Sequence, residues 1–171
     1  MADFIVYFSR AHQNYVNGVI RDLEVGNTEV VAKVLQKLTG ADLFKIEPII
    51  EYSEDYNKCI AQAQSDQRSN ARPELKDYPK DLSDFKKIYV CYPNYWSTLP
   101  MPVFTFLEHF DFVGKTILPL CTHEGSGMGS SEKDIRRLCP GARVEKGLAL
   151  RGGRIDQAES EIRAWLEQIG K

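Results

Sequence analysis

The sequence predicts an α/β fold in which a doubly wound, five-stranded parallel sheet is covered by helices on both faces. Two observations support this prediction. Short apolar runs alternate about five times with segments of helical periodicity, and most of the runs stop at polar, glycine or proline residues. The 171 residues are enough for one domain with its own core, and no segment resembles a linker, so we expect a single domain over residues 1–171.

The predicted strands are short and rich in β-branched and aromatic side chains. The first is apolar from Phe4 to Phe8, which indicates burial on both faces of the sheet. The second alternates apolar and polar residues, which is typical of a strand near an edge. In order, the five runs cover residues 3–8, 42–47, 87–92, 116–121 and 143–150.

Between these runs, apolar residues recur three and four positions apart, the pattern of an amphipathic helix. The first such helix follows Asn27 and Thr28 and ends before Gly40. Pro102 stands at a typical first position of another helix. Three further helices are predicted over residues 53–70, 130–138 and 154–169.

The connection after the first strand is long, because residues 11–25 separate the strand from Gly26. Four of its apolar residues fall three and four positions apart: Val16, Val19, Ile20 and Leu23. This spacing predicts a short amphipathic helix. Connections of this length in compact domains tend to be functional or disordered. We expect the segment to fold over the neighbouring loop, with Asn14 or Tyr15 facing a ligand; the alternative is packing elsewhere on the surface or at a dimer contact.

Ligands of parallel α/β sheets bind beyond the carboxyl ends of the strands, so the loops there carry functional information. The first loop runs from Ser9 and Arg10 to Gly26, Asn27 and Thr28 at a helix N-terminus, which suits a phosphate group. The alternative is plain capping of the helix by Asn27 or Thr28. The loop matches neither the Walker A pattern nor G-x-G-x-x-G, which disfavours ATP, GTP and dinucleotides bound in the Rossmann manner.

The loop after the third strand contains Pro93, Asn94, Tyr95 and Trp96. Two large aromatic side chains directly after a central strand offer faces for a flat ring system. The alternative is that Tyr95 and Trp96 only cap the hydrophobic core.

The loop after the fourth strand is rich in glycine, so its backbone can approach a ligand closely. The alternative is a flexible linker. Its residues are Thr122, His123, Glu124, Gly125, Ser126 and Gly127. Since no other residue forms a metal-binding set with His123, we predict no metal site.

Taken together, a phosphate loop, a pair of aromatic rings and a glycine-rich loop fit a mononucleotide with a large flat ring. FMN is the best chemical match. Because no second phosphate loop is visible, we expect FMN and not FAD.

Several motifs in this order resemble the flavodoxin-like family, and within it the short bacterial flavodoxins that bind FMN. They are Tyr7-Phe8-Ser9 leading to Gly26-Asn27-Thr28, and residues 70–75, 92–96, 100–108, 114–116 and 122–127. The resemblance implies the strand order 2-1-3-4-5 and FMN at the switch point between the first and third strands.

The resemblance also implies which residues hold the cofactor. Ser9, Asn27, Thr28 and the backbone of Arg10 would bind the phosphate. Residues 93–96 would line the ribityl chain and one side of the ring, and residues 122–127 its other edge. The chain departs from the family pattern in the insertion 11–25, in Tyr95-Trp96-Ser97 where two Trp and a Gly are frequent, and in Glu124 where Gly is common.

Two functions from different classes fit such a site. One is an FMN-dependent NAD(P)H oxidoreductase acting on small acceptors such as quinones. The other is a one-electron carrier that serves a redox partner protein and has no substrate of its own. Carrier flavodoxins are strongly acidic as a family, whereas this chain has 22 basic and 24 acidic residues and a net charge of −2. The third loop offers one acid, Glu124, beside His123 as a candidate positive charge, so we favour the oxidoreductase. A flavin-free interaction module is a third alternative, disfavoured by the intact three-loop pattern.

The composition excludes several other classes. A nearly balanced charge predicts no nucleic-acid partner. The apolar runs are far shorter than the roughly 20 residues that cross a bilayer, and no basic, apolar leader is visible, so we expect a cytoplasmic protein. The four cysteines lie far apart in the sequence, as expected for reduced thiols. The oligomeric state stays open, with a homodimer as one option.

Overall fold

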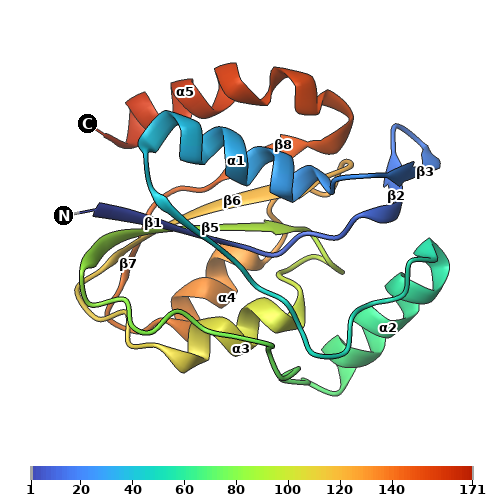
Figure 1. Cartoon of the computed structure of the whole chain (residues 1–171), viewed down its shortest axis with the longest axis horizontal. Coiled ribbons are helices and arrows are strands. Elements are labelled where there is room, and N and C mark those ends of the chain that lie inside the picture. The colour runs from blue at the N-terminus through green and yellow to red at the C-terminus, as the bar shows by residue number, and fades with distance from the viewer. Residues whose placement is uncertain (1, 171) are drawn as a thin grey trace.

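The computed structural model describes residues 2–170 and confirms the parallel α/β architecture (Figure 1). The main sheet has the order β4-β1-β5-β6, and two short strands, β7 and β8, both pair with β6. Its pairings are all parallel. With β7 and β8 counted as halves of one strand, this is the predicted order 2-1-3-4-5. The strands are β1 (Ala2–Tyr7), β4 (Asp42–Lys45), β5 (Phe85–Pro93), β6 (Thr116–His123), β7 (Arg143–Val144) and β8 (Leu148–Arg151).

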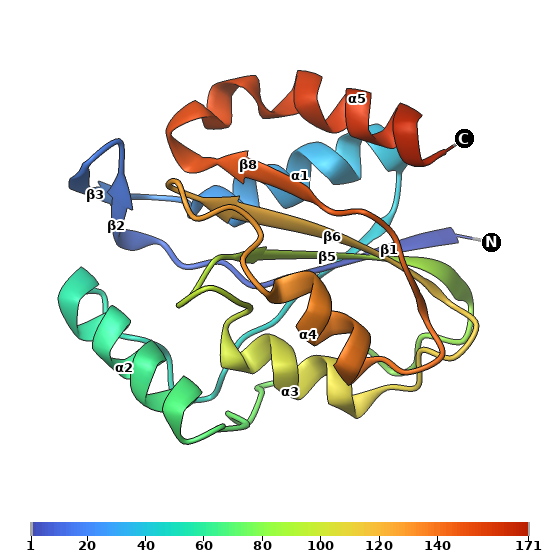
Figure 2. The same cartoon turned by 180° about the vertical axis from the view of Figure 1, so that it is seen from behind.

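Helices cover both faces of this sheet (Figure 2). On one face lie α1 (Asn27–Thr39) and α5 (Ala158–Ile169), and on the other α3 (Met101–His109) and α4 (Ser131–Leu138). Because successive strand residues point to opposite faces, β1 contributes side chains to two separate cores. Phe4 and Val6 belong to the core beneath α3 and α4, whereas Ile5 and Tyr7 belong to the core beneath α1 and α5.

The helix α2 (Tyr56–Arg68) stands apart from these layers (Figure 1). It begins after Asp55, whose side chain accepts a hydrogen bond of 2.9 Å from the Lys58 amide. Its main packing partners are α3 and β2 (His12–Val16), a strand that lies outside the main sheet. Cys59 and Ala63 are its buried residues. The inner face of α2 therefore borders the carboxyl edge of the sheet without covering it.

The predicted strand 143–150 is broken between Val144 and Leu148. The break lies beside Pro119 of β6, which has no amide hydrogen to donate to a neighbouring strand. The prediction that the last helix begins at Arg154 is also wrong. A 3₁₀ segment, η1 (Gly152–Gln157), occupies that part of the chain, and α5 begins at Ala158.

The inserted segment is not a helix but a β-hairpin of β2 (His12–Val16) and β3 (Val19–Leu23). Its turn is Asn17-Gly18, with φ of 52° and 84°, as the favoured two-residue hairpin turn requires. Val16 pairs with Val19, and Tyr15 with Ile20. The spacing that predicted a helix therefore arises from apolar pairs across the turn, and Asn17-Gly18 is the signal that distinguishes the two.

All four cysteines are buried free thiols, as predicted. Within residues 2–170, no helix combines the length and the hydropathy needed to cross a membrane.

Candidate cofactor-binding site

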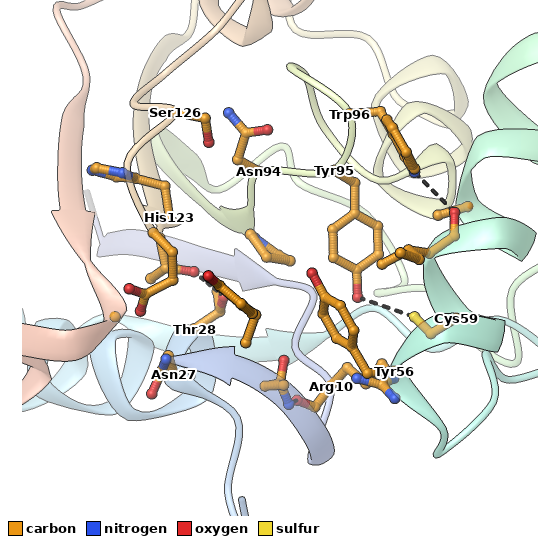
Figure 3. A pocket seen from close by; sticks show the side chains of 18 of the residues that line it. Arg10, Asn27, Thr28, Tyr56, Cys59, Asn94, Tyr95, Trp96, His123 and Ser126 are labelled. Carbon is orange, nitrogen blue, oxygen red and sulfur yellow. Dashed lines mark hydrogen bonds between the residues drawn. The ribbon is translucent and has the colours of Figure 1, made fainter. Parts of the chain in front are cut away.

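A cavity of about 460 Å³ opens at the carboxyl edge of the sheet, where the three predicted loops meet (Figure 3). This size is in the usual range of small-molecule sites. Gly26 and Gly127 are not among its lining residues. The predicted residues that line it are Ser9, Arg10, Asn14, Tyr15, Asn27, Thr28, Pro93, Asn94, Tyr95, Trp96, Thr122, His123, Glu124, Gly125 and Ser126.

One end of the cavity is formed by the start of α1. Gly26 occupies the N-cap position and supplies no capping side chain, so the capping by Asn27 or Thr28 that we considered does not occur. The first amides of a helix have no partner within it. The Glu29 amide donates to Ser9 Oγ at 3.0 Å. The Asn27 and Thr28 amides are thus the donors that the first turn offers to an anion.

Gly26 also lets two chain segments meet closely. A Cβ atom at this position would overlap Ser9 Oγ and lie 2.5 Å from the carbonyl oxygen of Arg10. The strand end and the helix start can therefore come together only with glycine at position 26.

Thr28 joins this end of the cavity to the third loop. Its Oγ1 lies 2.8 Å from Thr122 Oγ1, and both residues are buried. Each hydroxyl therefore has a hydrogen-bond partner in the protein, and this bond holds the start of α1 against the end of β6.

The Arg10 side chain is directed toward the segment before α2. Its guanidinium donates to the carbonyl oxygens of Ser53, Glu54 and Gln13, at 2.9 and 2.7 Å for Ser53 and 2.7 Å for Glu54. Most of its side-chain donors are therefore already engaged. We expect the backbone of Arg10, and not its side chain, to contact a bound anion.

Aromatic side chains form the opposite end of the cavity (Figure 3). The Trp96 side chain is 42% exposed, and its Nε1 donates to the Ile60 carbonyl of α2 at 2.9 Å. Tyr95 packs edge-on against Phe8, with ring centroids 5.8 Å apart, and burial raises the pKa of its hydroxyl. Tyr95 is therefore partly a core residue, as in the alternative considered above, while Trp96 borders the opening.

Sequence reasoning missed the contribution of α2 to this wall. Its lining residues are Tyr56, Cys59, Ile60 and Ala63, and Ser97 and Gly152 also line the cavity. The α2 residues are spaced three to four apart in an otherwise polar helix, which is the signal that could have revealed them. Burial raises the pKa of the Cys59 thiol, so this wall is uncharged at neutral pH.

The third loop is hydrogen-bonded to its surroundings and is not the flexible linker considered above. Asn94 Nδ2 donates to the Gly127 carbonyl at 2.8 Å, and the Gly125 amide donates to His123 Nδ1 at 2.8 Å. Burial, and then the charge of Arg151, lower the pKa of His123, so its ring is neutral at pH 7. This lowered pKa argues against His123 as the candidate positive charge beside Glu124. The cation beside this loop is Arg151, whose Nη2 donates to the Glu124 carbonyl at 3.2 Å.

Among the described residues, no cluster of three or more His, Cys, Asp or Glu side chains could hold a metal ion.

Comparison with known proteins shows the family of this chain. Residues 23–169 match the family model described as flavodoxin. The chain belongs to the flavodoxin family. Among curated proteins, a search found no match.

Several solved structures share this fold. A candidate flavoprotein from Bacteroides eggerthii is 25% identical with a TM-score of 0.79, and the match covers 99% of this chain and 98% of that one. A Lactobacillus acidophilus flavoprotein in complex with FMN is 17% identical, with a TM-score of 0.65 and coverage of 96% and 97%. A Fusobacterium nucleatum flavodoxin bound to FMN is 12% identical, with a TM-score of 0.57 and coverage of 99% and 98%.

Proposed function

We propose that this flavodoxin-family protein binds FMN in the cavity and acts as an FMN-dependent NAD(P)H oxidoreductase that reduces small acceptors such as quinones. One observation carries the proposal. Amide donors at the start of α1, an aromatic wall and a backbone-rich loop surround a single cavity at the switch point of the sheet. The FMN complexes of the Lactobacillus and Fusobacterium proteins support the choice of cofactor.

The residues at the phosphate end fit FMN. The Asn27 and Thr28 amides would bind the phosphate at the positive end of the α1 dipole. The close approach of Ser9 to Gly26 shapes this end, and the Ser9 hydroxyl is positioned there by the Glu29 amide. Asn14 of the hairpin lines the same cavity.

The residues at the other end fit a flat ring. Trp96, Tyr56 and Ile60 present apolar surface, and the Gly125 and Ser126 backbone offers polar groups for the edge of a heterocycle. Bound FMN supplies hydride and electron transfer. The protein would bind and orient the ring and keep one of its sides away from water.

The surroundings of the cavity favour an oxidoreductase over a carrier. Of the described lining residues, Glu124 is the one acid, and the net charge of the chain is −2. Tyr15 and Trp96 are 44% and 42% exposed at the opening. An apolar, weakly charged opening suits a flat neutral acceptor better than a basic protein partner.

The first test is reconstitution of the apoprotein with FMN, followed by anaerobic addition of NADH or NADPH. We expect mass spectrometry to identify FMN as the bound chromophore. We also expect the flavin absorbance to bleach on addition of the pyridine nucleotide and to return repeatedly when a quinone is added. Photoreduction without any reduction by NADH or NADPH would contradict the oxidoreductase and support a carrier.

A second test is the variant Gly26→Ala, which places a methyl group against Ser9 Oγ and the Arg10 carbonyl. Because backbone must move to accommodate it, we expect FMN binding to fall by at least about a hundredfold, the equivalent of about 2.7 kcal/mol. Unchanged FMN affinity in a folded Gly26→Ala protein would show that the phosphate does not bind at this end.

A further inference from the structure

Exposed apolar side chains gather at the opening of the cavity. Tyr15 and Ile20 of the hairpin and Trp96 of the loop after β5 are 44%, 46% and 42% exposed. Tyr15 and Ile20 are paired directly across β2 and β3, so their side chains lie on the same face of the hairpin. Of these three residues, Tyr15 and Trp96 line the cavity. Exposed apolar side chains that gather beside a cavity indicate contact with a further molecule.

Tyr15 extends the aromatic wall to which Tyr56 belongs. The centroids of the two rings lie 6.1 Å apart, with an angle of 30° between the ring planes. Figure 3 shows the Tyr56 side chain reaching from α2 into the cavity. Tyr56 is half-buried, whereas Tyr15 is exposed. The two rings therefore continue one aromatic surface from the inside of the cavity to its opening.

The base of the hairpin holds these two rings together. Gln13 precedes Tyr15 by two residues in β2, so both side chains lie on the same face of the strand. Gln13 Oε1 accepts a hydrogen bond of 2.9 Å from the Tyr56 amide, and the Gln13 amide donates to the Glu54 carbonyl at 3.2 Å. These bonds tie β2 to the start of α2 before any ligand binds, which lowers the entropic cost of binding at the pair.

The tip of the hairpin is held as well. The Asn17 amide donates to Glu124 Oε2 at 3.3 Å. The Asn17 side chain packs against Gly153 so closely that a Cβ atom there would lie 2.6 Å from Asn17 Cγ. Tyr15 therefore lies on a strand that is bonded to the segment before α2 at its base and to the loop after β6 at its tip.

The chemistry of the opening suits a flat and uncharged molecule. Arg10 and Glu124 are the charged residues of the described lining, together with the neutral ring of His123. The Arg10 guanidinium is bonded to carbonyl oxygens of neighbouring residues. Of the two Glu124 carboxylate oxygens, Oε1 is buried and Oε2 accepts from the Asn17 amide. The groups left at the opening are therefore aromatic and aliphatic surfaces, on which another aromatic ring can stack.

We propose that Tyr15 is a specificity-determining residue that binds an aromatic electron acceptor by stacking at the opening of the cavity. This inference rests on the proposed function. A bicyclic quinone would lie against the exposed face of Tyr15, on the aromatic surface that continues inward through Tyr56 to the part of the cavity proposed for the flavin ring. The match to the family model begins at residue 23, so Tyr15 lies outside it and this role does not follow from family membership.

The test compares two acceptors of opposite character on the FMN-loaded protein. The flavin is photoreduced without oxygen, with EDTA as the electron donor, and is then mixed with 1,4-naphthoquinone or with ferricyanide, an anion without an aromatic ring. We expect the reoxidation rate to saturate with naphthoquinone. Tyr15→Val, which keeps a good strand former, should raise the half-saturating concentration by about fivefold to tenfold, with a smaller effect on the limiting rate. The ferricyanide rate should change by less than about twofold.

Two further variants separate stacking from a structural role of the side chain. Tyr15→Phe keeps the ring and should restore the half-saturating concentration to within about twofold of wild type. Val19→Thr is the matched control, because Val19 is 49% exposed, lies on the opposite face of the same hairpin and does not line the cavity. It should leave both acceptors unaffected. An equal loss in Val19→Thr, or no recovery in Tyr15→Phe, would contradict stacking on Tyr15.

Two measurements do not depend on the behaviour of variants or on turnover. In the wild-type protein, 1,4-naphthoquinone should half-saturate at a concentration about fivefold or more below that of 1,4-benzoquinone, which offers less ring surface. Equilibrium dialysis of 1,4-naphthoquinone against the oxidised FMN-loaded protein should give a dissociation constant that Tyr15→Val raises by the same factor as in the kinetic test.

The outcomes separate this inference from the proposed function. Naphthoquinone rates that do not saturate, or that Tyr15→Val leaves unchanged, would overturn the inference and leave the FMN site intact. Saturation that depends on Tyr15, without any reduction of the flavin by NADH or NADPH, would support the inference and remove the pyridine nucleotide from the proposed function. Failure of the wild-type protein to bind FMN would overturn both.

Discussion

The helices α1 and α2 show how differently two helices of similar amphipathic pattern are used in this protein. In α1, Val31, Ala32 and Leu35 are completely buried between the sheet and α5. In α2, Cys59 and Ala63 are the buried residues, and the helix borders the cavity instead of covering the sheet. The apolar face of α1 therefore stabilises the fold, whereas the apolar face of α2 is available to a ligand.

The same helical periodicity can therefore indicate either a helix packed on the sheet or a helix that lines a cavity. A face packed on the sheet contributes its burial free energy in every folded molecule. A face that borders a cavity contributes most of it only when a ligand is bound. Substitutions on the two helices should therefore separate stability from binding.

The largest expected effect is that of Leu35→Ala on α1. Because Leu35 is fully buried, the free energy of unfolding should fall by about 2–5 kcal/mol, measured by urea denaturation. The FMN affinity of the molecules that remain folded should stay within about threefold. A large loss of FMN affinity with little loss of stability would show that α1 acts as part of the ring site.

The next effect is that of Ile60→Ala on α2. We expect the free energy of unfolding of the apoprotein to change by less than about 1 kcal/mol. FMN affinity, measured by fluorescence titration, should fall by about tenfold because apolar contact with the ring is lost. If the apoprotein is instead as strongly destabilised as Leu35→Ala, then α2 belongs to the core and the comparison fails.

A smaller effect concerns Glu29, in the first turn of α1, which makes the free energy of unfolding depend on pH. Burial raises the pKa of this carboxyl, but the hydrogen bond from Lys33 and the charge of Lys45 outweigh it, so the pKa lies below its usual value. A lowered folded-state pKa stabilises the protein above the unfolded-state pKa of about 4.3, and this stabilisation is lost as the pH falls through the folded-state pKa.

The corresponding measurement is acid unfolding of wild-type protein and Glu29→Gln. The difference in unfolding free energy between them should be constant above about pH 5 and should shrink below about pH 4. Glu161→Gln serves as the exposed control. A difference that grows as the pH falls would have the wrong sign for this mechanism.

The smallest effect is expected at Lys37, two residues after Leu35 on the same helix. Lys37 Nζ lies 4.0 Å from Glu159 Oε2, and both side chains are largely exposed, at 73% and 43%. Lys37→Gln should change the free energy of unfolding by less than about 1 kcal/mol, and added salt should reduce the difference further. A loss comparable to that of Leu35→Ala would show that position on α1, rather than burial, decides the effect.

Much of the fold could be predicted because the relevant signals are local. The apolar run Phe4 to Phe8, the helix between Thr28 and Gly40 and the glycine-rich loop after β6 all depend on neighbours within a few residues. The failures arose where local signals were ambiguous or incomplete. Val16, Val19, Ile20 and Leu23 fit both a helix and a two-residue hairpin, and the positive φ of Asn17 and Gly18 decided for the hairpin.

The parallel sheet and the positions of three loops at its carboxyl edge could be predicted from the sequence, because periodicity and turn residues are properties of short segments; the near-neutral charge follows from composition. Which groups meet at that edge could not be predicted in this way, because it depends on how the chain packs in three dimensions. The separation of α2 from the sheet, the neutral ring of His123 beside Arg151 and the contact of Asn17 with Glu124 all depend on residues far apart in the chain. Packing, burial and charge act through distances in space, and no pattern within one segment records them.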